Sequence, residues 1–256
     1  MTLIEWTHWP GRKGLTWNPW PWIGCTKVSP GCDKCYMYRV AKQFGHSGEF
    51  DAEALKVTHK LHYPSTVKEP SVFFVNSMYD TWHSGIPDSA RDTIFWEMVK
   101  HPQHIFLNLT KRARQMKKYV DARDWLSDAD NIWFGVSVEN ADYLWRIEEL
   151  HDTLCSNRFI SFEPLLGPIN SAQLDAHGVK FIDWVITGGE SDYKDPRPMN
   201  PEWVKTIRDF CIINNTPFFH KQNGGTKKCK CHGSYGCCLL NEKEYREYPK
   251  GMVPEK

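Results

Sequence analysis

Three cysteines lie within eleven positions of the sequence, in the segment GCTKVSPGCDKCYMYR at residues 24–39. Cys25, Cys32 and Cys35 have the spacing C-x6-C-x2-C, and a Pro-Gly pair predicts a turn just before the second cysteine. Thiolates are soft ligands that favour zinc, copper(I) and iron–sulfur clusters. A [4Fe–4S] cluster usually takes four cysteines, so three would leave one iron open to a small molecule. The spacing therefore predicts a catalytic cluster rather than a closed structural metal site.

Two other interpretations of this loop stay open. A zinc ion could take the three thiolates together with a fourth ligand such as His46, or the thiols could be unligated. The chain carries nine cysteines, and it shows neither a signal-peptide core nor an apolar stretch near the roughly 20 residues of a membrane span. We therefore expect a cytoplasmic protein, in which clustered thiols bind metal more often than they form disulfides.

Length and charge limit the classes of protein that fit. The chain has 256 residues and 41% hydrophobic residues, which suits one large α/β domain. Its 32 Lys and Arg residues nearly balance 31 Asp and Glu residues, for a net charge of +1. The overall charge argues against a non-specific nucleic-acid binder, although a local basic groove stays compatible with it.

Seven short runs rich in β-branched and aromatic residues recur along the chain, and they are apolar on both faces. This pattern is typical of buried parallel strands. Between them lie helical patterns at 87–101 and 200–214, the second with Asn200 as N-cap and Pro201 at the first helical position. The alternation predicts a β/α barrel or an open doubly wound sheet. The predicted strands are 21–25, 71–80, 104–112, 132–140, 158–167, 183–191 and 217–225.

Polar residues follow six of these predicted strands, at the end where barrels build their active sites. The repetition predicts a functional rim rather than scattered surface charge. Its candidate members are Asn76, Ser77, Asp80, Lys111, Arg112, Ser137, Glu139, Glu163, Glu190, Ser191, Lys221 and Gln222.

The cysteine loop, with the aromatic Tyr36 directly after the third cysteine, resembles the radical S-adenosylmethionine (SAM) superfamily. The sequence is more similar still to a largely uncharacterised, phage-associated branch with three cysteines. Two features depart from the superfamily pattern, because its commonest spacing is C-x3-C-x2-C and its GGE motif normally ends the second strand. The segments that carry the resemblance are 17–19, 25–36, 75–80, 109–112, 135–139, 163–169, 188–191, 197–199 and 218–225.

The resemblance implies a partial TIM-type β/α barrel over residues 1–225, with a [4Fe–4S] cluster on Cys25, Cys32 and Cys35. SAM would bind the open iron, and its cleavage would give a 5′-deoxyadenosyl radical that abstracts hydrogen from a substrate. The residues that the resemblance places at SAM are Tyr36, with Asn76, Ser77 and Asp80 at the amino group, and Ser137 and Glu139 at the ribose and carboxylate. Lys111 and Arg112 could bind a phosphate or the SAM carboxylate, or they could belong to an ordinary solvated helix start. Gly188, Gly189 and Glu190 would line the adenosine or the substrate, and Glu163 and Glu190 are the candidate catalytic residues. Glu163 could instead be a buried strand-end carboxylate tied to backbone N–H groups.

The resemblance also implies partners. The substrate would be a nucleotide or a nucleic-acid base that is modified by a rearrangement, an isomerase type of reaction. The electron donor would be a flavodoxin or ferredoxin in a bacterial or phage-infected cell, and no membrane is involved. The alternative is a non-catalytic zinc- or cluster-binding protein that binds nucleic acid or a protein partner.

The segment 226–256 is rich in Gly, Cys and Lys and is predicted to be an extension of the barrel. Cys229, Cys231, Cys237 and Cys238 have the spacing C-x-C-x5-C-C, with His232 inside the group. They could hold zinc or an auxiliary iron–sulfur cluster, or stay reduced in a loop. Elsewhere, Cys211 is predicted to be a small core residue. The N-terminal tryptophans could stack bases, but core packing is the favoured interpretation for Trp6, Trp9, Trp17, Trp20 and Trp22.

Overall fold

The computed structural model describes residues 2, 4–20, 22–56, 58–191, 194–227 and 236–249. It divides into two compact units. The first unit is Met1–Phe134 with Thr153–Asn157, and the second is Gly135–Asp152 with Arg158–Lys256. The predicted boundary between a barrel and an extension at residue 225 stays a prediction.

The seven strands follow one another in chain order in the sheet. Parallel pairing holds for β1 with β2 and β2 with β3 in the first unit, and for β5 with β6 and β6 with β7 in the second. The predicted α/β class with buried parallel strands is confirmed. The strands are β1 Lys13–Trp17, β2 Ser71–Val75, β3 Ile105–Thr110, β4 Ile132–Ser137, β5 Asn157–Phe162, β6 Trp184–Gly188 and β7 Phe218–Gln222.

The first strand is not where the sequence pattern predicted it. Strand β1 is Lys13–Trp17, and its Leu15 pairs with Phe73 of β2. The predicted strand at 21–25 is wrong, because Trp22 and Gly24 both have left-handed backbones, with φ of 67° and 68°. An extended strand needs negative φ, so these residues turn the chain instead. The other six strands overlap the predicted runs.

Both predicted helices are confirmed, as α3 and α8. Asn200 caps α8 with its side-chain oxygen, which accepts a hydrogen bond from the Glu202 N–H at 3.0 Å. None of the helices that the structure describes combines the length and apolar composition needed to cross a membrane. The α-helices are α1 Tyr36–Gln43, α2 Tyr63–Thr66, α3 Asp88–Val99, α4 Ala113–Val120, α5 Asp124–Ser127, α6 Trp145–His151, α7 Ser171–Ala176 and α8 Pro201–Ile213. Short 3-10 turns are Glu5–Thr7, Pro30–Cys32, Ala52–Ala54, His59–His62, Ala141–Tyr143 and Val179–Phe181.

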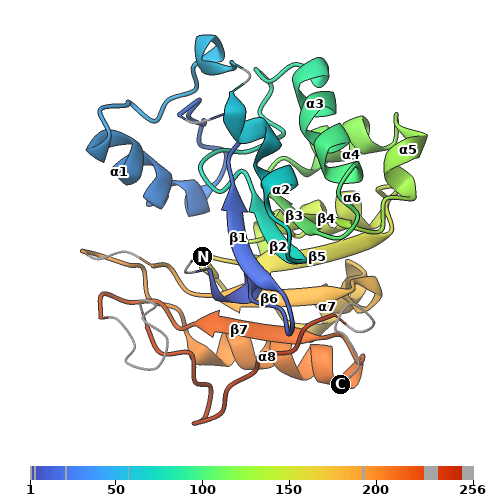
Figure 1. Cartoon of the computed structure of the whole chain (residues 1–256). Coiled ribbons are helices and arrows are strands. Elements are labelled where there is room, and N and C mark those ends of the chain that lie inside the picture. The colour runs from blue at the N-terminus through green and yellow to red at the C-terminus, as the bar shows by residue number, and fades with distance from the viewer. Residues whose placement is uncertain are drawn as a thin grey trace. The chain divides into compact units, whose positions relative to one another are not determined.

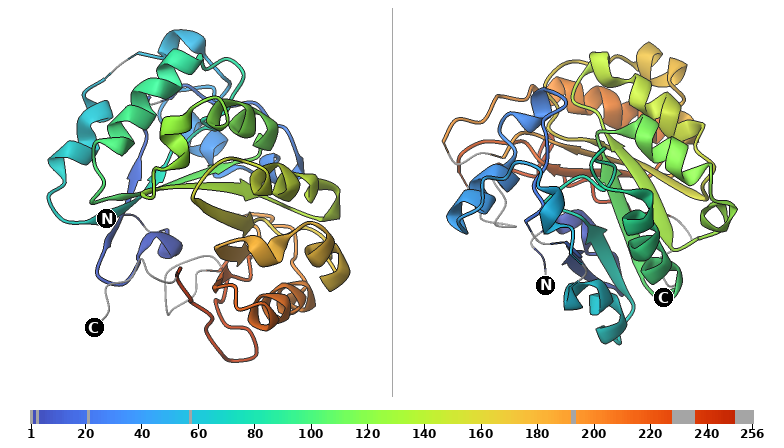
Figure 2. Two further views of the ribbon diagram at one scale, coloured as in Figure 1. Left: turned by 90° about the vertical axis from the view of Figure 1, so that its right-hand side faces the viewer. Right: turned by 90° about the horizontal axis from the view of Figure 1, so that it is seen from above.

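Aromatic side chains build the core of the first unit. Helices α3 and α4 lie side by side (Figures 1 and 2), and Phe95 of α3 contacts Tyr119 of α4 with ring centroids 5.5 Å apart. On the N-terminal segment, Trp9 meets Trp133 of β4 edge to face at 5.5 Å. The favoured core-packing interpretation of the N-terminal tryptophans is confirmed for four that are buried, Trp6, Trp9, Trp17 and Trp20.

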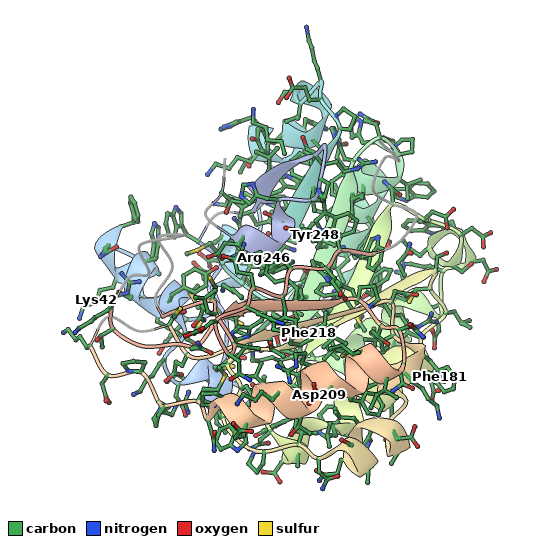
Figure 3. All side chains as sticks on the ribbon, turned by 90° about the horizontal axis from the view of Figure 1, so that it is seen from below. Lys42, Phe181, Asp209, Phe218, Arg246 and Tyr248 are labelled. Carbon is green, nitrogen blue, oxygen red and sulfur yellow. The ribbon has the colours of Figure 1, made fainter. Side chains whose placement is uncertain are left out.

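In the second unit, helix α8 lies along strand β7 (Figure 1), and the C-terminal segment pairs with the same strand. Phe219 and Arg246 form an antiparallel bridge, and the His220 N–H donates to the Tyr245 carbonyl at 2.8 Å. Arg246 and Tyr248, labelled in Figure 3, contact Phe219 of β7, with the Arg246 guanidinium 5.3 Å and the Tyr248 ring 5.5 Å from its ring centroid. Residues 245–247 therefore extend the hydrogen bonding of the second unit beyond β7.

The cap of α8 provides a test of the local prediction. We expect Asn200→Ala to lower the free energy of unfolding by about 1 kcal/mol, because the first turn of the helix loses an acceptor for an otherwise unpaired N–H. Asn200→Ser, which keeps a capping oxygen, should stay within a few tenths of a kcal/mol of the wild type. Urea unfolding followed by circular dichroism measures both, and equal stabilities of all three proteins would contradict the assignment of the cap.

Candidate functional site

The cysteine loop is held by backbone contacts on both sides of Cys25. The Cys25 N–H donates to the Gly48 carbonyl at 3.0 Å, and the Tyr38 hydroxyl donates to the Cys25 carbonyl at 2.9 Å. The 3-10 turn Pro30–Cys32 carries the second cysteine, and Cys35 is the residue directly before helix α1. Loop and helix together place the three thiols on one short stretch of backbone.

The charges of the three loop cysteines all act on the pKa of Tyr38. Burial is the largest cause that raises the pKa of Tyr38 to about 12, and the negative charges of Cys25, Cys35 and Cys32 raise it further. Burial also raises the pKa of Cys35, to which Cys32 adds a smaller effect in the same direction. All three cysteines are half-buried free thiols. They are therefore close enough to interact electrostatically with the same tyrosine.

No three His, Cys, Asp or Glu side chains among the described residues lie close enough together to hold a metal ion. His46, the suggested fourth zinc ligand, stacks on Trp22 with ring centroids 4.8 Å apart and an interplanar angle of 10°. In its chemistry, the donor set of three free thiols on one loop fits a three-cysteine iron–sulfur cluster.

Arg112 links the cysteine loop to the end of strand β3. Its Nη1 lies 3.6 Å from Cys25 Sγ and 3.0 Å from Asp80 Oδ2, and its Nη2 donates to both Thr26 oxygens at 2.9 Å. Burial alone would lower the pKa of Arg112, but the charges of Asp80 and Cys25 outweigh it, so the pKa is raised. The sequence pattern marked Arg112 only as a possible anion-binding residue at the rim, and its contact with a cysteine was missed.

Asp80 uses both carboxylate oxygens within the first unit. Oδ1 accepts from the Thr110 hydroxyl at 2.8 Å and from the Trp82 N–H at 3.0 Å, and Oδ2 accepts from Arg112 and from the Lys111 N–H at 3.2 Å. The residue was predicted to hold the SAM amino group. The structure places it as the counter-ion of Arg112, and the SAM contact stays a prediction.

Asn76, Ser77 and Tyr36 come together at the end of strand β2. The Tyr36 hydroxyl donates to the Ser77 carbonyl, and the Asn18 side chain bonds to Ser77 Oγ at 3.1 Å and to the Met78 N–H at 3.0 Å. Asn76 has a left-handed backbone with φ of 58°, and its buried Oδ1 has no hydrogen-bond partner in the part of the chain that is described. A buried carbonyl oxygen normally accepts a hydrogen bond, so Oδ1 is open to an N–H donor such as an amino group.

Lys111, the remaining predicted SAM contact of the first unit, lies beside Asp80 and the cysteine loop. Its charge lowers the pKa of Cys35, an effect smaller than the opposing one of burial. Lys27 also lowers the pKa of Cys35. Together with Arg112, three cationic residues therefore act on the cysteines of the loop. Positive charges around the loop stabilise thiolates, the form that binds metals.

Two candidate carboxylates of the second unit form ion pairs there. Glu139 is fully buried with Arg146, whose Nη1 donates to Glu139 Oε2 and to the Ser137 carbonyl, both at 2.8 Å. Glu163 Oε1 accepts from Lys221 Nζ at 2.5 Å, and both side chains are about one-fifth exposed. Buried charges of this kind need a partner, so pairing accounts for these residues without a ligand. The predicted contacts of Glu139 and Ser137 with SAM stay predictions.

The GGES segment is shaped by close packing within the second unit. A Cβ on Gly188 would lie 3.1 Å from Glu163 Cδ, and one on Gly189 would lie 2.6 Å from the Asn223 backbone. Glu190 binds Arg197, whose Nε and backbone N–H both donate to Oε2 at 2.9 Å. A side chain at either glycine would crowd these neighbours, so close packing favours glycine there. The roles predicted for Gly188, Gly189 and Glu190 stay predictions.

Two of the four C-terminal cysteines can be placed. Cys238 is buried with its Sγ 3.7 Å from Glu244 Oε1, and Cys237 Sγ accepts from the Leu239 N–H at 3.4 Å. Cys229 and Cys231, together with His232, lie outside the described residues, so the predicted second metal site stays a prediction. Cys211 is fully buried, which confirms the core role predicted for it.

A polar chain holds this cysteine segment against strands β6 and β7. His220 bonds to the Thr187 hydroxyl at 2.9 Å through Nδ1 and to Asn223 Oδ1 at 3.0 Å through Nε2. Asn223 then binds the carbonyls of Cys237 at 2.8 Å and Leu239 at 3.0 Å. Burial lowers the pKa of His220 to about 4, so the imidazole is neutral at neutral pH.

The candidate residues fall into one set on each unit. Those of the first unit are Cys25, Cys32, Cys35, Tyr36, Asn76, Ser77, Asp80 and Lys111, and Arg112 and Asn18 join them. Those of the second unit are Ser137, Glu139, Glu163, Gly188, Gly189, Glu190, Cys237 and Cys238.

The family model described as "Protein of unknown function (DUF5131)" matches residues 1–249. No curated protein and no solved structure matches the chain.

Gly24 tests how tightly the cysteine loop is held. A Cβ there would lie 2.0 Å from the Glu49 carbonyl oxygen, in a backbone with φ of 68°. We expect Gly24→Ala to lower the free energy of unfolding by about 3 kcal/mol, from overpacking and left-handed strain together. Gly45→Ala is the matched control, because Gly45 has φ of 81° but no heavy atom within 4 Å of its Cβ position. That variant should lose about 1 kcal/mol. Equal losses in chemical denaturation would contradict the close contact.

His220 makes stability depend on pH. Its pKa is about 4 when folded and near 6.5 when unfolded, so between these values the unfolded chain binds more protons and stability falls as pH falls. We expect this residue to remove about 2 kcal/mol of stability between pH 7 and pH 5. Unfolding titrations of His220→Gln should show a dependence weaker by that amount. Exposed His59→Gln should behave like the wild type, and an unchanged pH dependence in His220→Gln would contradict the assignment.

Proposed function

We propose that this chain, which belongs to the DUF5131 family of proteins of unknown function, is a radical SAM enzyme. Cys25, Cys32 and Cys35 would hold a [4Fe–4S] cluster, and SAM would occupy its open iron. The observation that carries the proposal is the set of three half-buried free thiols on one short loop, with Arg112 Nη1 3.6 Å from Cys25 Sγ. Such a set suits a cluster with one open iron.

The surroundings of the loop support the same proposal. An iron–sulfur cluster with thiolate ligands is anionic, and Arg112, Lys111 and Lys27 all act electrostatically on the cysteines. The chemistry that such a group supplies is one-electron cleavage of SAM to a 5′-deoxyadenosyl radical. The protein's own contribution would be to hold the thiolates, to exclude water and to orient the two substrates.

Asn76 is the best-supported residue for binding SAM. Its buried Oδ1 is an acceptor with no donor among the residues that the structure describes, at the end of a strand next to Ser77 and Tyr36. The amino group of SAM is a donor of the kind this oxygen needs. Asp80 is less suited to that role, because four groups already donate to its two oxygens.

The fold is compatible with the proposal. A parallel sheet with its strands in chain order is the arrangement of a β/α barrel, and the proposal takes it to be a partial barrel of the radical SAM type. A nucleotide or nucleic-acid base as substrate, and a flavodoxin or ferredoxin as electron donor, belong to the proposal through the sequence resemblance alone.

The decisive experiment is anaerobic reconstitution of the full chain with iron and sulfide, followed by incubation with dithionite and SAM. We expect about four irons per chain, brown absorbance and the release of 5′-deoxyadenosine. A protein that takes up no cluster, and that retains zinc after purification without added metal, would contradict the proposal and support the non-catalytic alternative.

The cysteine loop can be tested residue by residue. We expect Cys32→Ala to abolish 5′-deoxyadenosine formation and to lower the iron content, because the cluster loses one of its three ligands. Cys155→Ala is the matched control, since Cys155 is a free thiol of the first unit outside the loop. It should retain both iron and activity. Retention of the cluster by Cys32→Ala would show that Cys32 is not a ligand, and its loss from Cys155→Ala as well would show that the effect is not specific to the loop.

A further inference from the structure

We propose that Arg112 is a positioning residue that binds the Cys25 ligand and raises the reduction potential of the cluster. Asp80, on the same guanidinium, limits that increase. This inference rests on the proposed function. It adds a named charge pair to the cluster site, and neither the sequence pattern nor the resemblance assigned that pair.

The geometry singles out Cys25 among the three cysteines. Arg112 Nη1 lies 3.6 Å from Cys25 Sγ, a distance suited to a hydrogen bond to sulfur, and the same nitrogen lies 3.0 Å from Asp80 Oδ2. Nη2 binds the backbone carbonyl and hydroxyl of Thr26, the residue after Cys25. The planar guanidinium therefore contacts the ligand, its neighbour and a carboxylate simultaneously, which a lysine ammonium could not reproduce.

The guanidinium itself is fixed. The Arg112 side chain is 9% exposed and that of Asp80 11%, so both charges are largely removed from solvent. Thr26 is held from the other side, because its hydroxyl lies 2.9 Å from His83 Nε2. A charge that can neither move away nor be screened by water acts strongly on its neighbours.

The direction of the effect follows from charge. Reduction adds one negative charge to the cluster, and a cation at a ligand sulfur stabilises the reduced form. Hydrogen bonds to the sulfurs are among the known determinants of cluster potential. Arg112 should therefore raise the potential, whereas the nearby Asp80 carboxylate should lower it.

The test is a redox titration of the reconstituted full chain, with dithionite as reductant and the reduced cluster detected by electron paramagnetic resonance. We expect Arg112→Gln to shift the midpoint to a more negative potential and Asp80→Asn to shift it to a more positive one. Opposite shifts distinguish a charge effect from damage to the loop, which would move both variants in one direction or remove the cluster. The control is Arg114→Gln, an exposed arginine two residues along, which should match the wild type.

Each outcome decides the inference. A midpoint for Arg112→Gln equal to the wild type, or shifts of the same sign in both variants, would overturn it while leaving the proposed function intact. If Arg112→Gln retains no iron, Asp80→Asn decides alone, and an unchanged or more negative potential overturns the inference. A wild-type chain that takes up no cluster at all removes the proposed function, and the inference with it.

Discussion

The buried ion pair between Asp80 and Arg112 is the contact on which the cysteine loop depends. It joins the end of strand β3 to the first thiol and to the residue that follows it, through Cys25 Sγ and the Thr26 oxygens. Removing one partner of such a pair leaves an uncompensated charge away from water and costs about 3–5 kcal/mol. The same interaction that holds the loop therefore also sets the charge next to the ligand sulfur.

At the candidate sites of both units, the charged carboxylates form ion pairs with an Arg or Lys side chain. Glu139 has Arg146, Glu163 has Lys221 and Glu190 has Arg197, each within the second unit. A carboxylate that is already paired binds a ligand only by exchanging its partner, whereas the orphan oxygen of Asn76 can accept a donor directly. This difference separates the paired carboxylates from Asn76, whose Oδ1 has no partner among the described residues.

Sequence patterns predicted the elements whose signals are local. Helix α8 was predicted down to its cap, because Asn200 and Pro201 act within one turn, and six strands overlapped their apolar runs. The first strand was wrongly placed at 21–25, because the composition there is strand-like while Trp22 and Gly24 have left-handed backbones. The amino-acid composition of a short segment predicts whether it is buried better than it predicts its backbone conformation.

The sequence by itself determined which donors share the loop: three thiols within eleven positions, with a turn between them. Only the tertiary structure decided which charges meet them. Arg112 is 87 residues from Cys25 along the chain and 32 from Asp80, and no local pattern encodes such a pairing. Spacing in a loop follows from covalent connection, whereas a buried ion pair forms only where strand ends are brought together by packing of the sheet.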